Sequence, residues 1–203
     1  DLTVFTENLH KPRNVSAMVR NCDAVGINEM HVSPTTDELR THWRTSQGAE
    51  KWMYIRAHAN AKAACSHLKH EGFQLVAAHL SDAAIDYRDV DYTQSTALVL
   101  GSELFGVSNE TLEHVDQQIN VPMMGVTQSL NVSVACAVGL YKAQRQRQAA
   151  GMYDHCRLDD DTLARQRFEW LHPVLADYCQ RHKLGYPALD ESGDLAEPMP
   201  RVD

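Results

Sequence analysis

Apolar and polar positions along the chain form short blocks whose spacing alternates between the periods of strands and of helices. Residues 2–7 alternate in polarity, which predicts a strand with one face buried. An apolar stripe at helical spacing then follows Asn14 and stops at Gly26. We therefore expect a helix that Asn14 caps and that ends just before Gly26, because glycine tolerates the positive φ found there.

The rest of the chain follows the same alternation. It predicts strands at residues 29–32, 52–55, 74–79, 96–100 and 118–121. It predicts helices at residues 60–71, 108–114, 130–150 and 161–182. We expect a long loop at 33–48 and a poorly ordered tail at 185–203. Because strands and helices alternate, we predict an α/β fold with a largely parallel sheet. We expect one domain at residues 1–155 and a helical C-terminal extension at 156–203.

Composition is that of an ordinary globular protein, with 203 residues of which 43% are hydrophobic and 23% charged. None of the apolar runs approaches the roughly 20 residues that a membrane helix needs, so we expect no membrane association. Five cysteines are scattered without a C-x-x-C pair, which favours free thiols in a reducing cytoplasm. The chain begins with Asp1 rather than methionine, so we expect a segment ahead of it.

The formal net charge of −8 counts against nucleic-acid binding when it is taken alone. The charges are unevenly placed, however: acidic residues concentrate after residue 158, and basic side chains gather at residues 11–20, 40–44 and 145–147. Screening confines electrostatic attraction to about 8–10 Å, so a local basic face can bind phosphates on an acidic protein. Charge therefore decides neither for nor against RNA.

Segments that follow strands of a parallel sheet meet at the edge where ligands bind, and three of them carry unusual residues. Residues 10–20, His-Lys-Pro-Arg-Asn-Val-Ser-Ala-Met-Val-Arg, hold Asn14 and Arg20 near one rim of a predicted helix. Residues 101–106, Gly-Ser-Glu-Leu-Phe-Gly, place a carboxylate between two glycines. Taken alone, the first segment is better explained as a capped amphipathic helix with a solvated arginine, and the second could be a plain tight turn.

A third segment, residues 121–133, leaves a strand through small and polar residues and enters a helix that Ser129 or Asn131 caps. Its backbone would suit an adenine edge, although a capped core helix explains it as well. Ser129 lacks the G-x-S-x-G elbow, which argues against a hydrolase nucleophile. Residues 65–70 hold three possible metal ligands, but no second cluster completes a site, so we expect no metal.

The three segments, in this order, resemble the signature motifs of the SPOUT RNA methyltransferases, most closely those of the TrmH branch. Residues 10–20 resemble the first motif, residues 101–106 the second, and residues 128–135, Gln-Ser-Leu-Asn-Val-Ser-Val-Ala, the third. The similarity continues through residues 140–153. Three ordered motifs are far more specific than any one of them.

This resemblance implies a Rossmann-like α/β domain whose C-terminal part threads a deep trefoil knot. It implies S-adenosylmethionine as the cofactor, no metal, and a homodimer formed by the knot helices. Such enzymes also carry a helical segment ahead of the first strand that helps to hold tRNA. The cofactor would be contacted, largely through backbone, at Ala78, Leu100, Gly101, Val121, Met123 and Leu130.

The reaction that the resemblance implies is methyl transfer to the ribose 2′-hydroxyl of guanosine 18 in the D-loop of tRNA. Arg20 would assist the attack by orienting the hydroxyl or stabilising the developing alkoxide. Asn14 would orient Arg20, and Glu103, Ser129 and Asn131 would shape the pocket. Candidate phosphate contacts are His10, Lys11, Arg13, Arg40, Arg44, Arg145 and Arg147.

Three alternatives stay open on the motifs alone. The chain could be another SPOUT 2′-O-methyltransferase that acts on rRNA or on a different tRNA position. It could be a non-catalytic RNA-binding protein, although the presence of Arg20 argues against this. It could also be a small-molecule α/β enzyme, although the glycine fingerprint of a dinucleotide fold is absent after the first strand.

Overall fold

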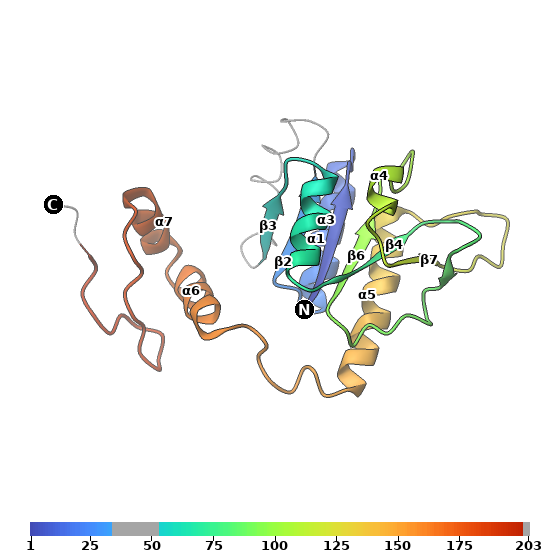
Figure 1. Cartoon of the computed structure of the whole chain (residues 1–203). Helices are drawn as coiled ribbons and strands as arrows, with labels where there is room; N and C mark the ends of the chain where they lie inside the picture. Colours follow the sequence, from blue (N-terminus) through green and yellow to red (C-terminus); the bar gives the residue numbers. More distant parts are fainter. Residues whose placement is uncertain (34–52, 201–203) are drawn as a thin grey trace. The chain divides into compact units, whose positions relative to one another are not determined.

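The computed structural model describes residues 1–33 and 53–200, which divide into two compact units, Asp1–Asp154 and His155–Asp203 (Figure 1). Most of the predicted loop at 33–48 lies outside the described residues. Each unit is described by itself below. None of the described helices is long and apolar enough to cross a membrane.

The first unit is built on a parallel sheet, which in the described residues has seven strands in the order β3-β2-β1-β6-β4-β7-β5. The strands are β1 (Leu2–Glu7), β2 (Glu29–Ser33), β3 (Tyr54–Ala57), β4 (Gln74–Ala78), β5 (Ile85–Asp86), β6 (Thr96–Leu100) and β7 (Gln117–Asn120). The predicted α/β class with a parallel sheet is confirmed. The two-residue strand β5 was not predicted, because it is too short to show a period.

Helices lie on both faces of this sheet (Figure 1). They are α1 (Pro12–Ala24), α3 (Ala61–His70), α4 (Asn109–Leu112) and α5 (Val132–Ala149). Consecutive residues of β1 show the two layers: Val4 belongs to the core cluster that contains residues of α1 and α5, and Phe5 belongs to the cluster that contains residues of α3. Both faces are therefore buried, as a doubly covered parallel sheet requires.

Local caps explain where several helices begin. Asn60 accepts a hydrogen bond from the backbone N–H of Ala63 at the start of α3, and Ser108 accepts one from Thr111 at the start of α4. The prediction that Asn14 caps α1 was wrong. The N-cap is Lys11 and the helix begins at Pro12, three residues earlier than predicted, because the φ of proline already suits a first helical turn. Gly26 follows the C-cap with a φ of 78°, as expected.

The second unit contains two helices, α6 (Asp160–Leu171) and α7 (Pro173–His182), where one helix was predicted at 161–182. The break falls at His172, because Pro173 disfavours helical geometry in the residue before it. Phe168 is buried and stacks on Tyr186 from the following segment, with ring centroids 4.6 Å apart. Part of the tail predicted to be poorly ordered therefore packs back onto these helices.

Candidate active site

The loop after β6 is closed on itself at the edge of the sheet where parallel strands end. The backbone N–H of Ser102 donates to the carbonyl of Gly106 at 3.0 Å, and the N–H of Gly106 donates back at 2.9 Å. A Cβ on Gly101 would lie 1.9 Å from the carbonyl carbon of Gly106, so only glycine fits there. Gly106 adopts a φ of 68°, which also favours glycine. The turn predicted from the sequence is thus a rigid loop with a fixed shape.

Glu103 turns from this loop toward the start of α1. Its carboxylate accepts hydrogen bonds from the backbone N–H groups of His10 and Lys11 at 3.1 and 3.2 Å, and from the amide of Asn14 at 2.7 Å. Partial burial acts to raise the pKa of this carboxyl, but the hydrogen bonds outweigh it and leave the pKa below its usual value. Glu103 is therefore held ionised, as an anionic cap supplied to α1 by another element.

Asn14 and Asn131 extend this contact to the third motif. The buried side chain of Asn14 accepts a hydrogen bond from the amide of Asn131 at 3.3 Å while it donates to Glu103. Asn131 also caps α5, because its side-chain oxygen accepts from the N–H and hydroxyl of Ser133. The three motifs are thus joined by one chain of side-chain hydrogen bonds.

Arg20 lies on the exposed side of α1, outside this chain of hydrogen bonds. Both ends of the Asn14 amide are engaged by Glu103 and Asn131, so the structure gives Asn14 a different partner from the Arg20 that we expected. The neighbouring Asn21, which sequence reasoning missed, donates to the carbonyl of Ser133 at 2.9 Å and ties the same part of α1 to α5. Its only sequence signal was its place beside Arg20.

The loop between β7 and α5 offers its backbone to a ligand. Within the described part of the chain, residues 121–130 form no backbone–backbone hydrogen bond. Ser129 is exposed in this loop, and its carbonyl accepts from the hydroxyl of Thr127. Val121, Met123 and Leu130 are half-buried, so apolar side chains line a segment whose N–H and C=O groups are not used by neighbouring backbone.

Residues 121–130 include three of the predicted cofactor contacts, Val121, Met123 and Leu130. Adenine needs an apolar surface and a few backbone donors and acceptors at its edge, and residues 121–130 supply both. Leu100 and Gly101 are buried at the end of β6, and Ala78 is half-buried at the end of β4. In the sheet, β6 lies between β1 and β4, and β4 lies between β6 and β7. The predicted cofactor residues therefore fall on adjacent strand ends and on the loop that follows β7.

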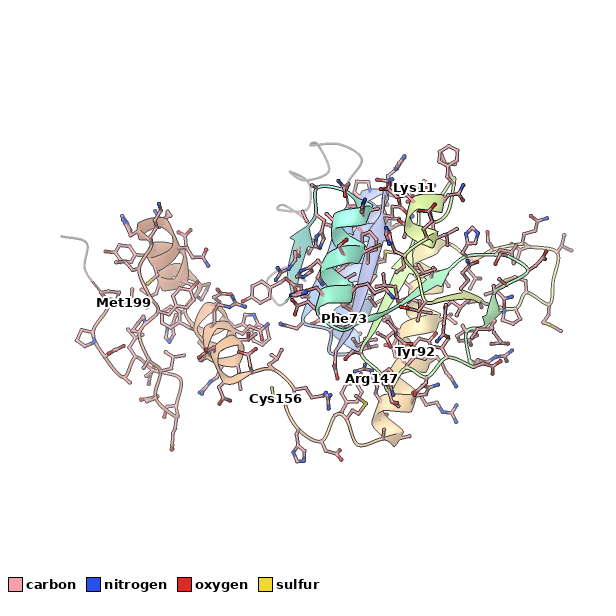
Figure 2. The ribbon with its side chains drawn as sticks, in the orientation of Figure 1. Lys11, Phe73, Tyr92, Arg147, Cys156 and Met199 are labelled. Carbon is pink, nitrogen blue, oxygen red and sulfur yellow. The ribbon has the colours of Figure 1, made fainter. Side chains whose placement is uncertain are left out.

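The predicted phosphate contacts differ in exposure: some are exposed, two lie outside the described residues, and Arg147 is buried. His10, Lys11, Arg13 and Arg145 are exposed, and Figure 2 labels Lys11 beside the start of α1. Arg40 and Arg44 lie outside the described residues. Among the described residues, no group of three or more His, Cys, Asp or Glu side chains could hold a metal ion.

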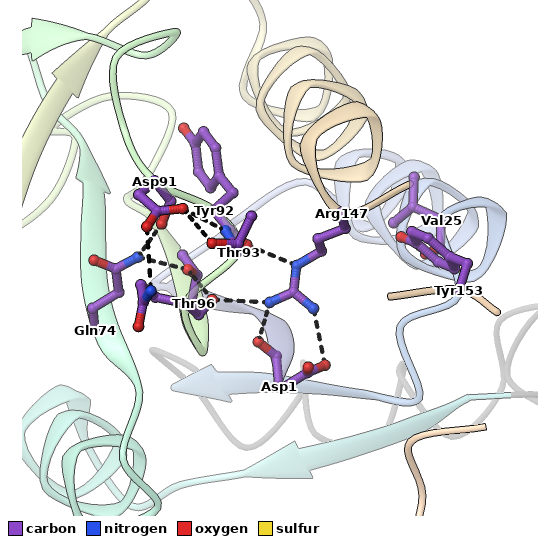
Figure 3. Close-up of polar contacts among 10 residues, drawn as sticks. Asp1, Val25, Gln74, Asp91, Tyr92, Thr93, Thr96, Arg147 and Tyr153 are labelled. Atoms are coloured by element: carbon purple, nitrogen blue, oxygen red, sulfur yellow. Dashed lines mark hydrogen bonds and ion pairs between the residues drawn. The ribbon is translucent and has the colours of Figure 1, made fainter. Parts of the chain in front are cut away.

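Arg147 is a correction to the predicted phosphate contacts. Its guanidinium is buried and donates to the carbonyls of Tyr92, Gln94 and Asp1 and to the Asp1 carboxylate, all within 2.9 Å (Figure 3). A guanidinium enclosed by four acceptors has no face left for a phosphate. Through these hydrogen bonds, Arg147 instead holds the C-terminal half of α5 against the segment that precedes β6.

Family models match almost the whole chain. The SpoU rRNA Methylase family matches residues 1–141, and the model described as "SpoU, rRNA methylase, C-terminal" matches residues 145–198. The chain therefore belongs to the SpoU methylase family. This confirms the resemblance to the SPOUT RNA methyltransferases.

Within this family, the relatives that are most informative are tRNA-modifying enzymes. The chain is 44% identical over 197 residues to the tRNA (guanosine(18)-2′-O)-methyltransferase of Escherichia coli, covering 96% of this chain and 86% of the relative. It is 48% identical over 171 residues to the enzyme of the same name from Thermus thermophilus, covering 84% and 88%. The crystal structure of the Aquifex aeolicus TrmH/SpoU tRNA modifying enzyme superposes with a TM-score of 0.71 at 38% identity, covering 91% and 90%.

Proposed function

We propose that this chain methylates the ribose 2′-oxygen of guanosine 18 in tRNA, with S-adenosylmethionine as the methyl donor. The observation that carries the proposal is the chain of hydrogen bonds through Glu103, Asn14 and Asn131, which joins the three motifs at the strand ends. The substrate is supported by the names of relatives that are 44% and 48% identical to this chain.

The cofactor is supported by the available backbone of residues 121–130 and by a solved relative. The SpoU methyltransferase AviRb in complex with AdoMet superposes on this chain with a TM-score of 0.64 at 25% identity, covering 72% of this chain and 60% of that one. When bound, S-adenosylmethionine supplies an electrophilic methyl group on a sulfonium. Val121, Met123 and Leu130 would provide apolar contacts, and the backbone near Ala78, Leu100 and Gly101 would complete the site.

Arg20 would act on the ribose. A 2′-hydroxyl must lose its proton as it attacks, and arginine stays protonated in proteins, so Arg20 would stabilise the developing alkoxide or act through a nearby phosphate. Glu103 and Asn131 would serve as positioning residues, since their hydrogen bonds go to other protein groups. Ser129 would face the target nucleotide from the exposed loop.

The remaining family expectations are part of the same proposal. The methyltransferase domain would span residues 1–155 and be followed by a helical extension at 156–203. The chain would form a homodimer through α5, thread a trefoil knot and work in the cytoplasm.

Substitution of Arg20 tests its proposed role in the reaction of the ribose 2′-hydroxyl. We expect Arg20→Ala to lower the rate of methyl transfer to tRNA by about a hundredfold to a thousandfold, because an interaction made only in the transition state is removed. Affinity for S-adenosylmethionine, measured by calorimetry, should stay within about twofold. Turnover at the wild-type rate would contradict the role of Arg20. Methyl transfer to rRNA instead of tRNA would contradict the proposal that tRNA is the substrate.

A further inference from the structure

Two large apolar side chains stand exposed at the tip of the loop after β6. Leu104 is 77% exposed and Phe105 is 84% exposed. A single exposed apolar residue is ordinary, but two adjacent ones beside a candidate active site are the kind of surface that marks a binding contact. Neither side chain takes part in the hydrogen bonds that build the site, so the proposed reaction leaves them unexplained.

The loop presents the phenyl ring on a rigid support. The paired backbone bonds between Ser102 and Gly106 close it, and the N–H of Phe105 donates to the Ser102 hydroxyl at 3.1 Å. Gly101 fixes the base of the loop through its close approach to Gly106. Because the backbone that carries the ring is already fixed, less conformational entropy is lost when a partner binds, and the contact contributes more to affinity.

Charge around the loop favours an anionic partner. The one acidic side chain of the loop, Glu103, turns inward onto the N–H groups of His10 and Lys11. Exposed side chains between residue 10 and the first turn of α1, the segment that Glu103 contacts, include His10, Lys11 and Arg13. An exposed aromatic ring beside basic side chains is the combination that binds unpaired nucleotides, because bases stack on the ring while phosphates meet the cations.

We infer that Phe105 stacks on an unpaired base of the tRNA next to the methylated nucleotide, with Leu104 packing along the same base. The inference rests on the proposed function, which supplies the tRNA. An aromatic face accepts any base, so this contact adds affinity rather than sequence selection. Phe105 therefore belongs to substrate binding and makes no contact with the reacting atoms.

The test compares Phe105→Ala, Phe105→Leu and Phe105→Trp, with Val174→Ala as the control. Val174 is 77% exposed but lies in the other compact unit. We expect Phe105→Ala to weaken binding of an unmodified tRNA transcript roughly tenfold, within the range for loss of one stacked base. Phe105→Leu should be nearly as weak, because it keeps apolar area without a π face. Phe105→Trp should bind like wild type, with indole fluorescence quenched by tRNA beyond that of wild type.

Binding and methyl transfer are measured separately, so the two proposals fail in different ways. Wild-type affinity of Phe105→Ala for tRNA would overturn the stacking role, even if tRNA is methylated. A shift of Phe105→Ala from dimer to monomer in sedimentation would also overturn it, by assigning the ring to a subunit interface. If the wild type binds tRNA without methylating it, and Phe105→Ala loses that binding, the stacking role stands and the proposed function falls.

Discussion

At the scale of single residues, the candidate site depends on Gly101 and Glu103 more than on any freely exposed catalytic group. Gly101 lets the loop close against its own far end, and that closure directs Glu103 toward the start of α1. Glu103 then fixes Asn14, and Asn14 contacts Asn131. The positions of Glu103, Asn14 and Asn131 therefore depend on a backbone contact that only glycine at position 101 permits.

Gly101→Ala tests this dependence. The added Cβ would meet the backbone of Gly106, which cannot move without breaking the paired bonds with Ser102, so we expect a loss of about 3 kcal/mol in the free energy of unfolding. Urea denaturation measures this loss. Gly125→Ala is the matched control, because a Cβ added at Gly125 would meet nothing within 4 Å. Equal stability of the two variants would contradict the proposed dependence.

Sequence reasoning found the residues of the site but not their partners. Asn14, Glu103 and Asn131 each stand in a recognisable motif, yet Asn14 was expected to cap α1 and to orient Arg20. Its partners lie 89 and 117 positions away in the sequence. Local pattern fixes the residue type that a turn or cap requires, whereas such long-range pairs depend on how the sheet is ordered.

At the scale of elements, β6 and α3 agree with prediction because their signals are local. The apolar run of β6 is bounded by Gly101, and Asn60 caps α3. Arg147 was misassigned because helical spacing does not reveal which neighbour covers a given face of α5. The break before Pro173 was missed because the apolar period continues across it.

Two nearby arginines of α5 should respond differently to substitution. Arg147 donates hydrogen bonds to the segment at residues 92–94, whereas Arg145 is exposed. Arg147→Met should lower the free energy of unfolding by about 3 kcal/mol, because it leaves the buried Tyr92 carbonyl and the partly buried acceptors of Asp1 without their donor. Arg145→Met, on the exposed face, should change stability by less than about 0.5 kcal/mol but reduce the salt dependence of tRNA binding. Urea denaturation and binding at several salt concentrations measure the two effects. Equal losses of stability in Arg147→Met and Arg145→Met would contradict the structural role assigned to Arg147.

A histidine cluster between β2, β3 and α3 predicts acid sensitivity. His31 is buried, and its Nδ1 lies 2.9 Å from Nε2 of His58, with the ring of His67 beside both. Burial first, and then the nearby His58, His67 and Arg56, lower the pKa of His31 to about 3. Burial first, and then His67 and Arg56, lower the pKa of His58 to about 4.

Since the unfolded chain binds these protons near pH 6.5 and the folded chain does not, stability should fall as pH drops below about 6.5. His31→Phe removes one of the two titrating groups while keeping a planar ring. Its free energy of unfolding should therefore fall less steeply than that of wild type between pH 7 and pH 5. Thermal denaturation across this range measures the slopes. Identical slopes would show that His31 is not the group responsible.

At the scale of the whole molecule, a net charge of −8 has to be reconciled with an RNA substrate. The exposed basic residues of the first unit, His10, Lys11, Arg13 and Arg145, are candidates for a local phosphate-binding face. Many acidic residues belong to the second unit, beyond Asp154. The fold class followed from the alternation of elements, whereas the proposed trefoil knot would be a property of the chain path, which no local pattern encodes.

The most direct test of the central claim is transfer of labelled methyl from S-adenosylmethionine to an unmodified tRNA transcript, with the modified nucleotide mapped. We predict label on the 2′-oxygen of guanosine 18, and none on a transcript whose nucleotide 18 carries a 2′-deoxyribose. Label on a base, on another ribose, or on the 2′-deoxy transcript would contradict the claim.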